Sequence, residues 1–314
     1  MRENNQDGTS IVQCVAMNRC ALCGASDGWP LQWNDDLSIQ QWRSDHGDRR
    51  DYSWTLCRDC GNGYPSFQPG LDLLSYYWNR DRQDAIVDFG DNEGAVWNAR
   101  RAVAQKGASR SFRFFGSQYQ KPGRFLDIAC GLGETVRYFA ERGWEAVGID
   151  ADPAVKRFHE QIGIQSKIGQ IESSAIDGKF DIIHISHAIY FITNPRQFLE
   201  SLRNSLSDDG ILCIVLANFM AADDQGLPGY PHSFFPTASS MNRLLALGGY
   251  ETVLHRKKSG SVYLVARAKS VLPPPVFPRL IRLGYRTKRL RYLIFGAPHL
   301  AARRLAKTII SLFR

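Results

Sequence analysis

Apolar runs alternate with helical patterns along residues 121–270, and this alternation constrains the fold more than any other feature of the chain. Strands are expected at seven runs: 124–129, 145–149, 166–168, 180–185, 211–217, 251–255 and 261–266. Helices are expected at 134–142, 153–162, 195–206 and 238–247, with Asp152 and Asn194 suited to cap two of them. The pattern predicts an α/β fold with a doubly wound, mostly parallel, seven-stranded sheet that binds ligand at the carboxyl ends of its strands.

The end of the first predicted strand carries a glycine turn flanked by carboxylates. Asp127 precedes the turn Ala129-Cys130-Gly131-Leu132-Gly133, and Asp150 ends the next strand, where it can bind two ribose hydroxyls. The third glycine of a dinucleotide fingerprint is missing, because position 136 is Val. Asp127 would repel a pyrophosphate but pair with an ammonium, so S-adenosylmethionine fits this pattern and NAD does not. Alternatively, the two carboxylates are ordinary strand-end residues and the glycines only make a turn.

Four of the seven cysteines form two C-x2-C-G motifs: Cys20, Cys23, Cys57 and Cys60. Two such motifs supply the four thiolates of a closed, structural Zn²⁺ site, and the glycine after each pair permits the tight turn. A redox pair and accidental spacing are the alternatives. Four tryptophans lie in or beside this segment and would pack a small module or stack on a sugar ring or base: Trp29, Trp33, Trp42 and Trp54.

These motifs together resemble the class I S-adenosylmethionine-dependent methyltransferases, in the branch whose Rossmann-like domain follows a four-cysteine zinc module and often acts on sugars or glycans. The resemblance covers about residues 20–268 and also rests on 147–150, 169–172, 180–183, Ser186-His187 and Asn194-Pro195. It implies cofactor contacts from Asp127, Ala129, Cys130, Gly131, Gly133, Asp150, Ala151, Gln170, Ile171 and Ser186. Gln170 and Ile171 would flank the adenine. Ala129 stands where the family usually has glycine, and Gln170 replaces a common aspartate.

Two histidines are candidate bases, because an alcohol acceptor must lose its proton during methyl transfer. His187 follows the strand 180–185, whose end faces the methyl group in this fold, and His232 lies in a loop after the fifth strand. Tyr190 and Phe191 replace the Glu and His that the family often has there. Alternatively, either histidine only satisfies local backbone or the cofactor carboxylate. We expect methyl transfer, to oxygen, on a small-molecule, sugar or lipid-linked glycan acceptor.

The net charge of +8 belongs to the C-terminal segment. Residues 272–314 hold ten Lys and Arg and no acidic residue, whereas the remainder of the chain has a net charge of −2. Apolar and basic residues recur there at helical spacing, which predicts that residues 278–314 lie on an anionic membrane surface. The alternatives are phosphate binding by an RNA methyltransferase, and a solvated or oligomer-forming helical pair.

The sequence therefore divides into a polar tail (1–18), a zinc-ribbon module (19–64), a helical linker (65–120), the cofactor-binding domain (121–270) and a basic amphipathic tail (271–314). A polar N-terminus and the lack of a long apolar run predict a cytoplasmic protein, and the basic tail predicts a peripheral position on the inner face of the cell membrane. A non-catalytic zinc adaptor with a vestigial cofactor fold is the non-enzymatic alternative. The oligomeric state is not predicted.

Overall fold

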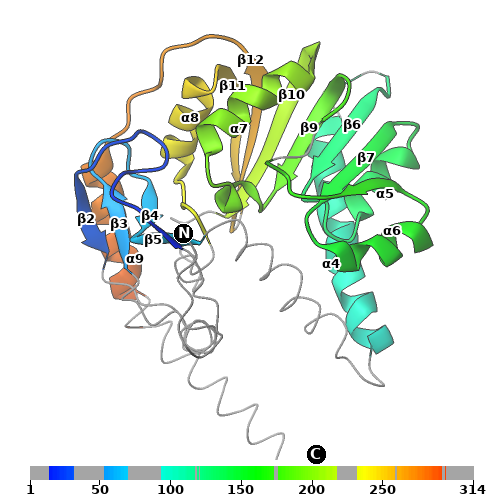
Figure 1. Cartoon of the computed structure of the whole chain (residues 1–314), viewed down its shortest axis with the longest axis horizontal. Helices are drawn as coiled ribbons and strands as arrows, with labels where there is room; N and C mark the ends of the chain where they lie inside the picture. The colour runs from blue at the N-terminus through cyan, green and yellow to red at the C-terminus, as the bar shows by residue number, and fades with distance from the viewer. Residues whose placement is uncertain are drawn as a thin grey trace, which may run out of the picture.

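The computed structural model describes residues 14–31, 53–69, 93–116, 119, 121–172, 176–217, 232–258, 260–291 and 294. A large sheet covered by helices stands beside a small β module, against which the last described helix packs (Figure 1). Predictions for Trp33, Trp42 and the chain beyond Ile294 lie outside the described residues.

Seven strands form the large sheet in the order β11-β12-β10-β9-β6-β7-β8. They are β6 (Arg124–Ile128), β7 (Glu145–Asp150), β8 (Gln165–Ile168), β9 (Phe180–Ser186), β10 (Leu206–Ala217), β11 (Tyr250–Lys258) and β12 (Ser261–Ala268). β12 runs in the opposite direction to the other six strands, so the predicted seven-stranded, mostly parallel sheet is confirmed. The order along the chain reverses between β6 and β9, and a ligand crevice is expected at their carboxyl ends.

Helices cover both faces of the sheet: α4 (Glu93–Phe115), α5 (Glu134–Ala140), α6 (Lys156–Gln161), α7 (Pro195–Leu202) and α8 (Ala238–Leu247). One apolar core lies under α4 and α5, and the other lies under α7 and α8. The expected cap at Asp152 is confirmed, because its Oδ1 accepts the N–H of Ala154 at 2.9 Å. Asn194 is the N-cap residue of α7 as expected, but its side-chain amide donates to Gln197 instead of capping the helix backbone.

Helix α4 packs on the sheet like the helices of the cofactor-binding domain. Its Phe115 is fully buried, and its Phe112 meets Phe139 of α5 edge to face, with 5.0 Å between the ring centroids. The sequence assigns this stretch to a linker, since its apolar residues do not form a clear stripe. In the structure α4 instead closes one face of the domain.

The small module consists of two antiparallel sheets. Strands β2 (Gly28–Leu31), β3 (Trp54–Cys57) and β4 (Gly63–Pro65) form one, while β1 (Cys14–Ala16) pairs with β5 (Phe67–Pro69) in the other. Gly63 also exchanges two backbone hydrogen bonds with Phe235, at 3.0 and 2.7 Å. Buried side chains of the module, Trp54 among them, join the core under α7 and α8. The module and the large domain therefore share one core.

The basic segment begins with helix α9 (Pro278–Arg291), which packs on the module rather than standing free (Figure 1). Tyr285 is buried there, and Ile281 occupies the space that a side chain at Gly61 would need. The guanidinium of Arg282 lies over the ring of Trp29, 4.6 Å from its centroid. No helix in the described part of the chain is long and apolar enough to cross a bilayer.

Candidate active site and metal centre

The four predicted cysteines meet in one cluster inside the small module. The Sγ atoms of Cys20 and Cys60 are 3.6 Å apart, those of Cys23 and Cys57 are 3.5 Å apart, and all four lie within 4.8 Å of one another. A tetrahedron with metal–sulfur bonds of about 2.3 Å has sulfur–sulfur edges of about 3.8 Å. The cluster therefore has the size and the donor set of a Zn²⁺ site without an open position.

The two cysteine turns repeat the same backbone geometry. The N–H of Gly24 donates to the carbonyl of Cys20 at 2.9 Å, and the N–H of Gly61 donates to the carbonyl of Cys57 at 3.1 Å. Both glycines have left-handed φ angles, +75° and +68°. A residue with a Cβ would be strained at either position, so the predicted need for glycine is confirmed.

Hydrogen-bond donors surround the sulfurs. The side-chain amide of Asn62 donates to the Sγ of Cys20 at 3.5 Å, and the backbone N–H of Asp59 donates to the Sγ of Cys57 at 3.4 Å. These contacts favour thiolates, which are the form of cysteine that binds metal.

The glycine turn after β6 combines an open front with a packed back. Gly131 (φ +54°) has no atom within 4 Å of the point where a Cβ would stand, so the space over it is open. A Cβ at Gly133 (φ +76°) would collide with Ile164, so glycine at this position lets the start of α5 pack closely against Ile164. Ala129 has a φ of +57°, a left-handed conformation that is strained for alanine.

Asp150 lies at the end of β7, directly beside this turn. Its Oδ2 accepts the N–H of Gly131 at 2.7 Å, and its Oδ1 accepts the N–H of Asp152 at 2.9 Å. The N–H of Gly169 donates to the carbonyl of Asp150 at 2.9 Å and so places Gln170 at the adjacent strand end. The turn, the carboxylate and the amide predicted to bind one ligand thus lie on β6, β7 and β8, which are neighbours in the sheet.

A buried histidine that the sequence does not reveal supports the turn from behind. Nε2 of His159 in α6 donates to the carbonyl of Gly131 at 2.7 Å, which leaves Nδ1 to accept from the hydroxyl of Ser166 at 2.8 Å. Gly131 and Ser166 both lie outside helix α6, so the helical pattern around His159 does not reveal these hydrogen bonds. The thiol of Cys130 lies nearby, and burial raises its pKa well above the ordinary value.

Asp127 is tied to a second buried histidine below the turn. Its Oδ1 lies 2.7 Å from Nδ1 of His184, whose Nε2 lies 3.2 Å from Oγ of Ser111 in α4. All three residues are buried, so His184 belongs to the core of the domain. The contact of Asp127 with a ligand ammonium stays a prediction, because one carboxylate oxygen is already paired with His184.

Ala151, Ile171 and Ser186, the other expected contacts, are half-buried near the ends of β7, β8 and β9. They lie at the same edge of the sheet as the turn and Asp150. Their contacts with a ligand stay predictions.

The two candidate bases gather around one phenol ring. His187 has a φ of +53°, and its Nδ1 lies 2.9 Å from Oη of the buried Tyr190. The ring of His232 lies 5.1 Å from that of Tyr190 and 4.7 Å from that of Phe191. Desolvation by the surrounding side chains, and then the nearby His184, lower the pKa of His187, although part of the residue is exposed. Burial raises the pKa of Tyr190, so the phenol stays protonated.

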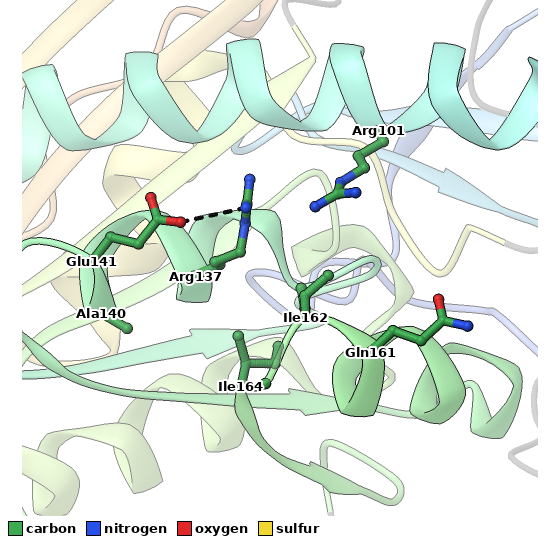
Figure 2. A pocket seen from close by; sticks show the side chains of 8 residues that line it. Arg101, Arg137, Ala140, Glu141, Gln161, Ile162 and Ile164 are labelled. Carbon is green, nitrogen blue, oxygen red and sulfur yellow. Dashed lines mark ion pairs between the residues drawn. The ribbon is translucent and has the colours of Figure 1, made fainter.

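A separate cavity of about 430 Å³ lies between α4, α5 and the turn after α6 (Figure 2). Arg101, Arg137 and Glu141 contribute its polar groups, and both arginines pair with the buried Glu134. No residue of the predicted cofactor set lines this cavity. It is therefore distinct from the predicted cofactor site at the glycine turn.

Comparisons with known proteins identify the large domain. The signature of a family described as "Methyltransferase domain" matches residues 98–255, half of the chain. The putative methyltransferase YqeM of Bacillus subtilis (strain 168) is 29% identical over 102 residues, which cover 29% of this chain and 40% of that protein. The chain thus matches less than half the length of this curated relative.

Solved structures give a weaker likeness. The glycopeptide N-methyltransferase MtfA in complex with S-adenosyl-L-homocysteine has a TM-score of 0.42 and 18% identity, covering 53% of this chain and 87% of its own. The protein PH0226 from Pyrococcus horikoshii OT3 has a TM-score of 0.46 and 16% identity, covering 60% and 99%. The family signature carries the assignment: the chain belongs to the methyltransferase-domain family.

Proposed function

We propose that the protein transfers a methyl group from S-adenosylmethionine to an oxygen atom of a sugar, a glycan or a related small molecule. The observation that supports the cofactor assignment is the hydrogen bond from the N–H of Gly131 to Oδ2 of Asp150, at 2.7 Å. A carboxylate beside a glycine with open space in front suits a ribose diol and the chain that extends from it. Asp150 would accept hydrogen bonds from the ribose, while Gln170 and Ile171 would flank the adenine.

The bound cofactor would supply a methyl carbon made electrophilic by its sulfonium. The remaining task of the protein is to hold the acceptor in line with that carbon and to remove the acceptor proton. As the new oxygen–carbon bond forms and the carbon–sulfur bond breaks, the hydroxyl proton must pass to a base.

His187 is the base in this proposal. Its lowered pKa keeps the imidazole neutral at neutral pH, the form that accepts a proton. When Nδ1–H donates to the Oη of Tyr190, Nε2 is left to take the proton of the acceptor. Tyr190 thus acts as a positioning residue, and His232 forms part of the acceptor wall beside it.

The four-cysteine cluster binds Zn²⁺ in a structural role. Its sulfur spacing, its N–H donors and its closed donor set support this assignment. The module then acts as a rigid wall of the large domain, since Gly63 and Phe235 are joined by backbone hydrogen bonds close to His232.

Calorimetry with S-adenosylmethionine and S-adenosylhomocysteine tests the cofactor assignment. We expect both to bind the full chain, and Asp150→Ala to weaken binding at least about tenfold through the loss of charge-assisted hydrogen bonds. Asp177→Ala, at an exposed position away from the crevice, is the matched control and should bind like the wild type. Lack of binding by the wild type would favour a zinc-containing adaptor instead.

Transfer of a radiolabelled methyl group to a panel of sugars, nucleotide sugars and lipid-linked glycans tests the acceptor. We expect His187→Asn to lower kcat and to leave cofactor binding unchanged. A product methylated on nitrogen or carbon would contradict the assignment to oxygen.

A further inference from the structure

Helix α9 turns an apolar stripe away from the protein. Leu280, Leu283, Leu290 and the following Ile294 are between 53% and 65% exposed. The three leucines lie on one side of α9, which has 3.6 residues per turn, opposite the buried Tyr285. Large aliphatic side chains in a row cost solvation energy unless another surface covers them.

Basic side chains flank this stripe on both sides. Residues 278–291 contain six Arg and Lys and no acidic residue. Arg279 and Arg286 are exposed along one edge of the stripe, and Arg291 is exposed along the other. A surface that combines aliphatic side chains with flanking positive charge is complementary to the headgroup region of an anionic bilayer.

The inner side of the same helix is fixed to the zinc module. Ile281 packs against Gly61, which follows the second cysteine pair, and Arg282 lies over Trp29 of β2. The stripe is therefore held in one orientation relative to the cysteine cluster. Through Gly63 and Phe235, the same module also contacts the segment that carries His232.

We propose that this outer face of α9, made of Leu280, Leu283, Leu290 and their flanking arginines, binds the surface of an anionic lipid bilayer. The zinc module orients the helix, so that binding holds the acceptor side of the enzyme at a constant position relative to the lipid. Phosphate recognition alone would need the arginines but would leave the leucines without a role. The bilayer contact rests on α9 and its contacts alone, whereas the position of the acceptor side rests on the proposed function.

Flotation of the full chain with phosphatidylcholine vesicles, with and without phosphatidylglycerol, tests this proposal. We expect flotation with the anionic vesicles only, decreasing as salt screens the arginines. Leu283→Ser with Leu290→Ser should reduce partitioning by about tenfold or more, because two side chains no longer insert. Arg279→Gln with Arg286→Gln should reduce it by about fivefold for each charge removed.

Val103→Ser with Val253→Ser is the matched control, since these valines are comparably exposed on elements remote from α9. It should float like the wild type. Equal flotation with neutral vesicles, or unchanged flotation of the leucine variant, would overturn the proposal. Salt-sensitive retention on RNA without flotation would also overturn it, in favour of nucleic-acid phosphates as the partner. The salt series on the wild type needs no variant and keeps the test decisive if a variant fails to fold.

Discussion

Replacing Ala129 by glycine should stabilise the protein, although a small-to-smaller substitution usually does the opposite. Ala129 has a φ of +57° at the end of β6, where the chain turns into the glycine loop. In this conformation the Cβ of an L-residue lies too close to the following carbonyl oxygen. The strain costs roughly 1–2 kcal/mol, and glycine does not incur it.

Two terms set the size of the effect. Glycine loses more backbone entropy than alanine on folding, which opposes the gain by about 0.5–1 kcal/mol. The midpoints of these two ranges leave a net stabilisation of about 0.75 kcal/mol, or about 2 °C in Tm for a domain of this size. Urea denaturation, followed by tryptophan fluorescence, measures the free energy of unfolding directly.

Ala102→Gly is the matched control, because Ala102 is an exposed residue in the interior of α4, where the backbone is helical. There the same chemical change should destabilise the protein by about 1 kcal/mol. The two variants must therefore shift stability in opposite directions. If Ala129→Gly lowers stability like Ala102→Gly, the strain at Ala129 does not exist and the reasoning is refuted.

Three further predictions follow from the buried and polar contacts. His184→Leu should destabilise the domain by about 3–5 kcal/mol in thermal unfolding, because the buried carboxyl group of Asp127 loses its partner. Ser111→Ala removes only one hydrogen bond to His184 and should cost about 1 kcal/mol. Chelation of zinc, or Cys57→Ser, should increase hydrogen exchange at the amide of Phe235, which donates to Gly63. The amide of Gly131, which donates to Asp150, should stay protected. Equal exchange at both amides would contradict a local role of the module. The methyl-transfer rate should rise with pH through an apparent pKa below 6.5 and then stay level, because the proposed base, His187, acts in its neutral form and its pKa is lowered. A rate that falls with pH over this range would exclude that role.

The sequence predicts the large sheet well because its strands are consecutive apolar runs that end at recognisable residues. The turn at Gly131 and the carboxylate of Asp150 are separated along the chain by one helix and one strand, so topology alone brings them together. The cysteine pairs are predictable for another reason: metal binding requires four thiolates at one point whatever the loop between them. In both cases a single physical requirement fixes the positions of a few residues.

Contacts made by side chains between distant elements do not leave such a pattern. His159 and Ser111 support the site through hydrogen bonds to groups 28 and 73 residues away, and nothing in their neighbours distinguishes them from surface residues. Helix α4 lacks an apolar stripe clear enough to show that it packs on the sheet.

In the basic segment, too, contacts with distant residues decide a feature that the local sequence does not reveal. Its composition predicts a helix with apolar and charged sides, but which side meets protein depends on Gly61 and Trp29, more than two hundred residues earlier in the chain. Because the module covers Ile281 and Tyr285, the leucines are left on the outer side together with Arg279 and Arg286. The cysteine module therefore decides which face of α9 is left exposed, and loss of the proposed Zn²⁺ should disturb that orientation before it disturbs the large sheet.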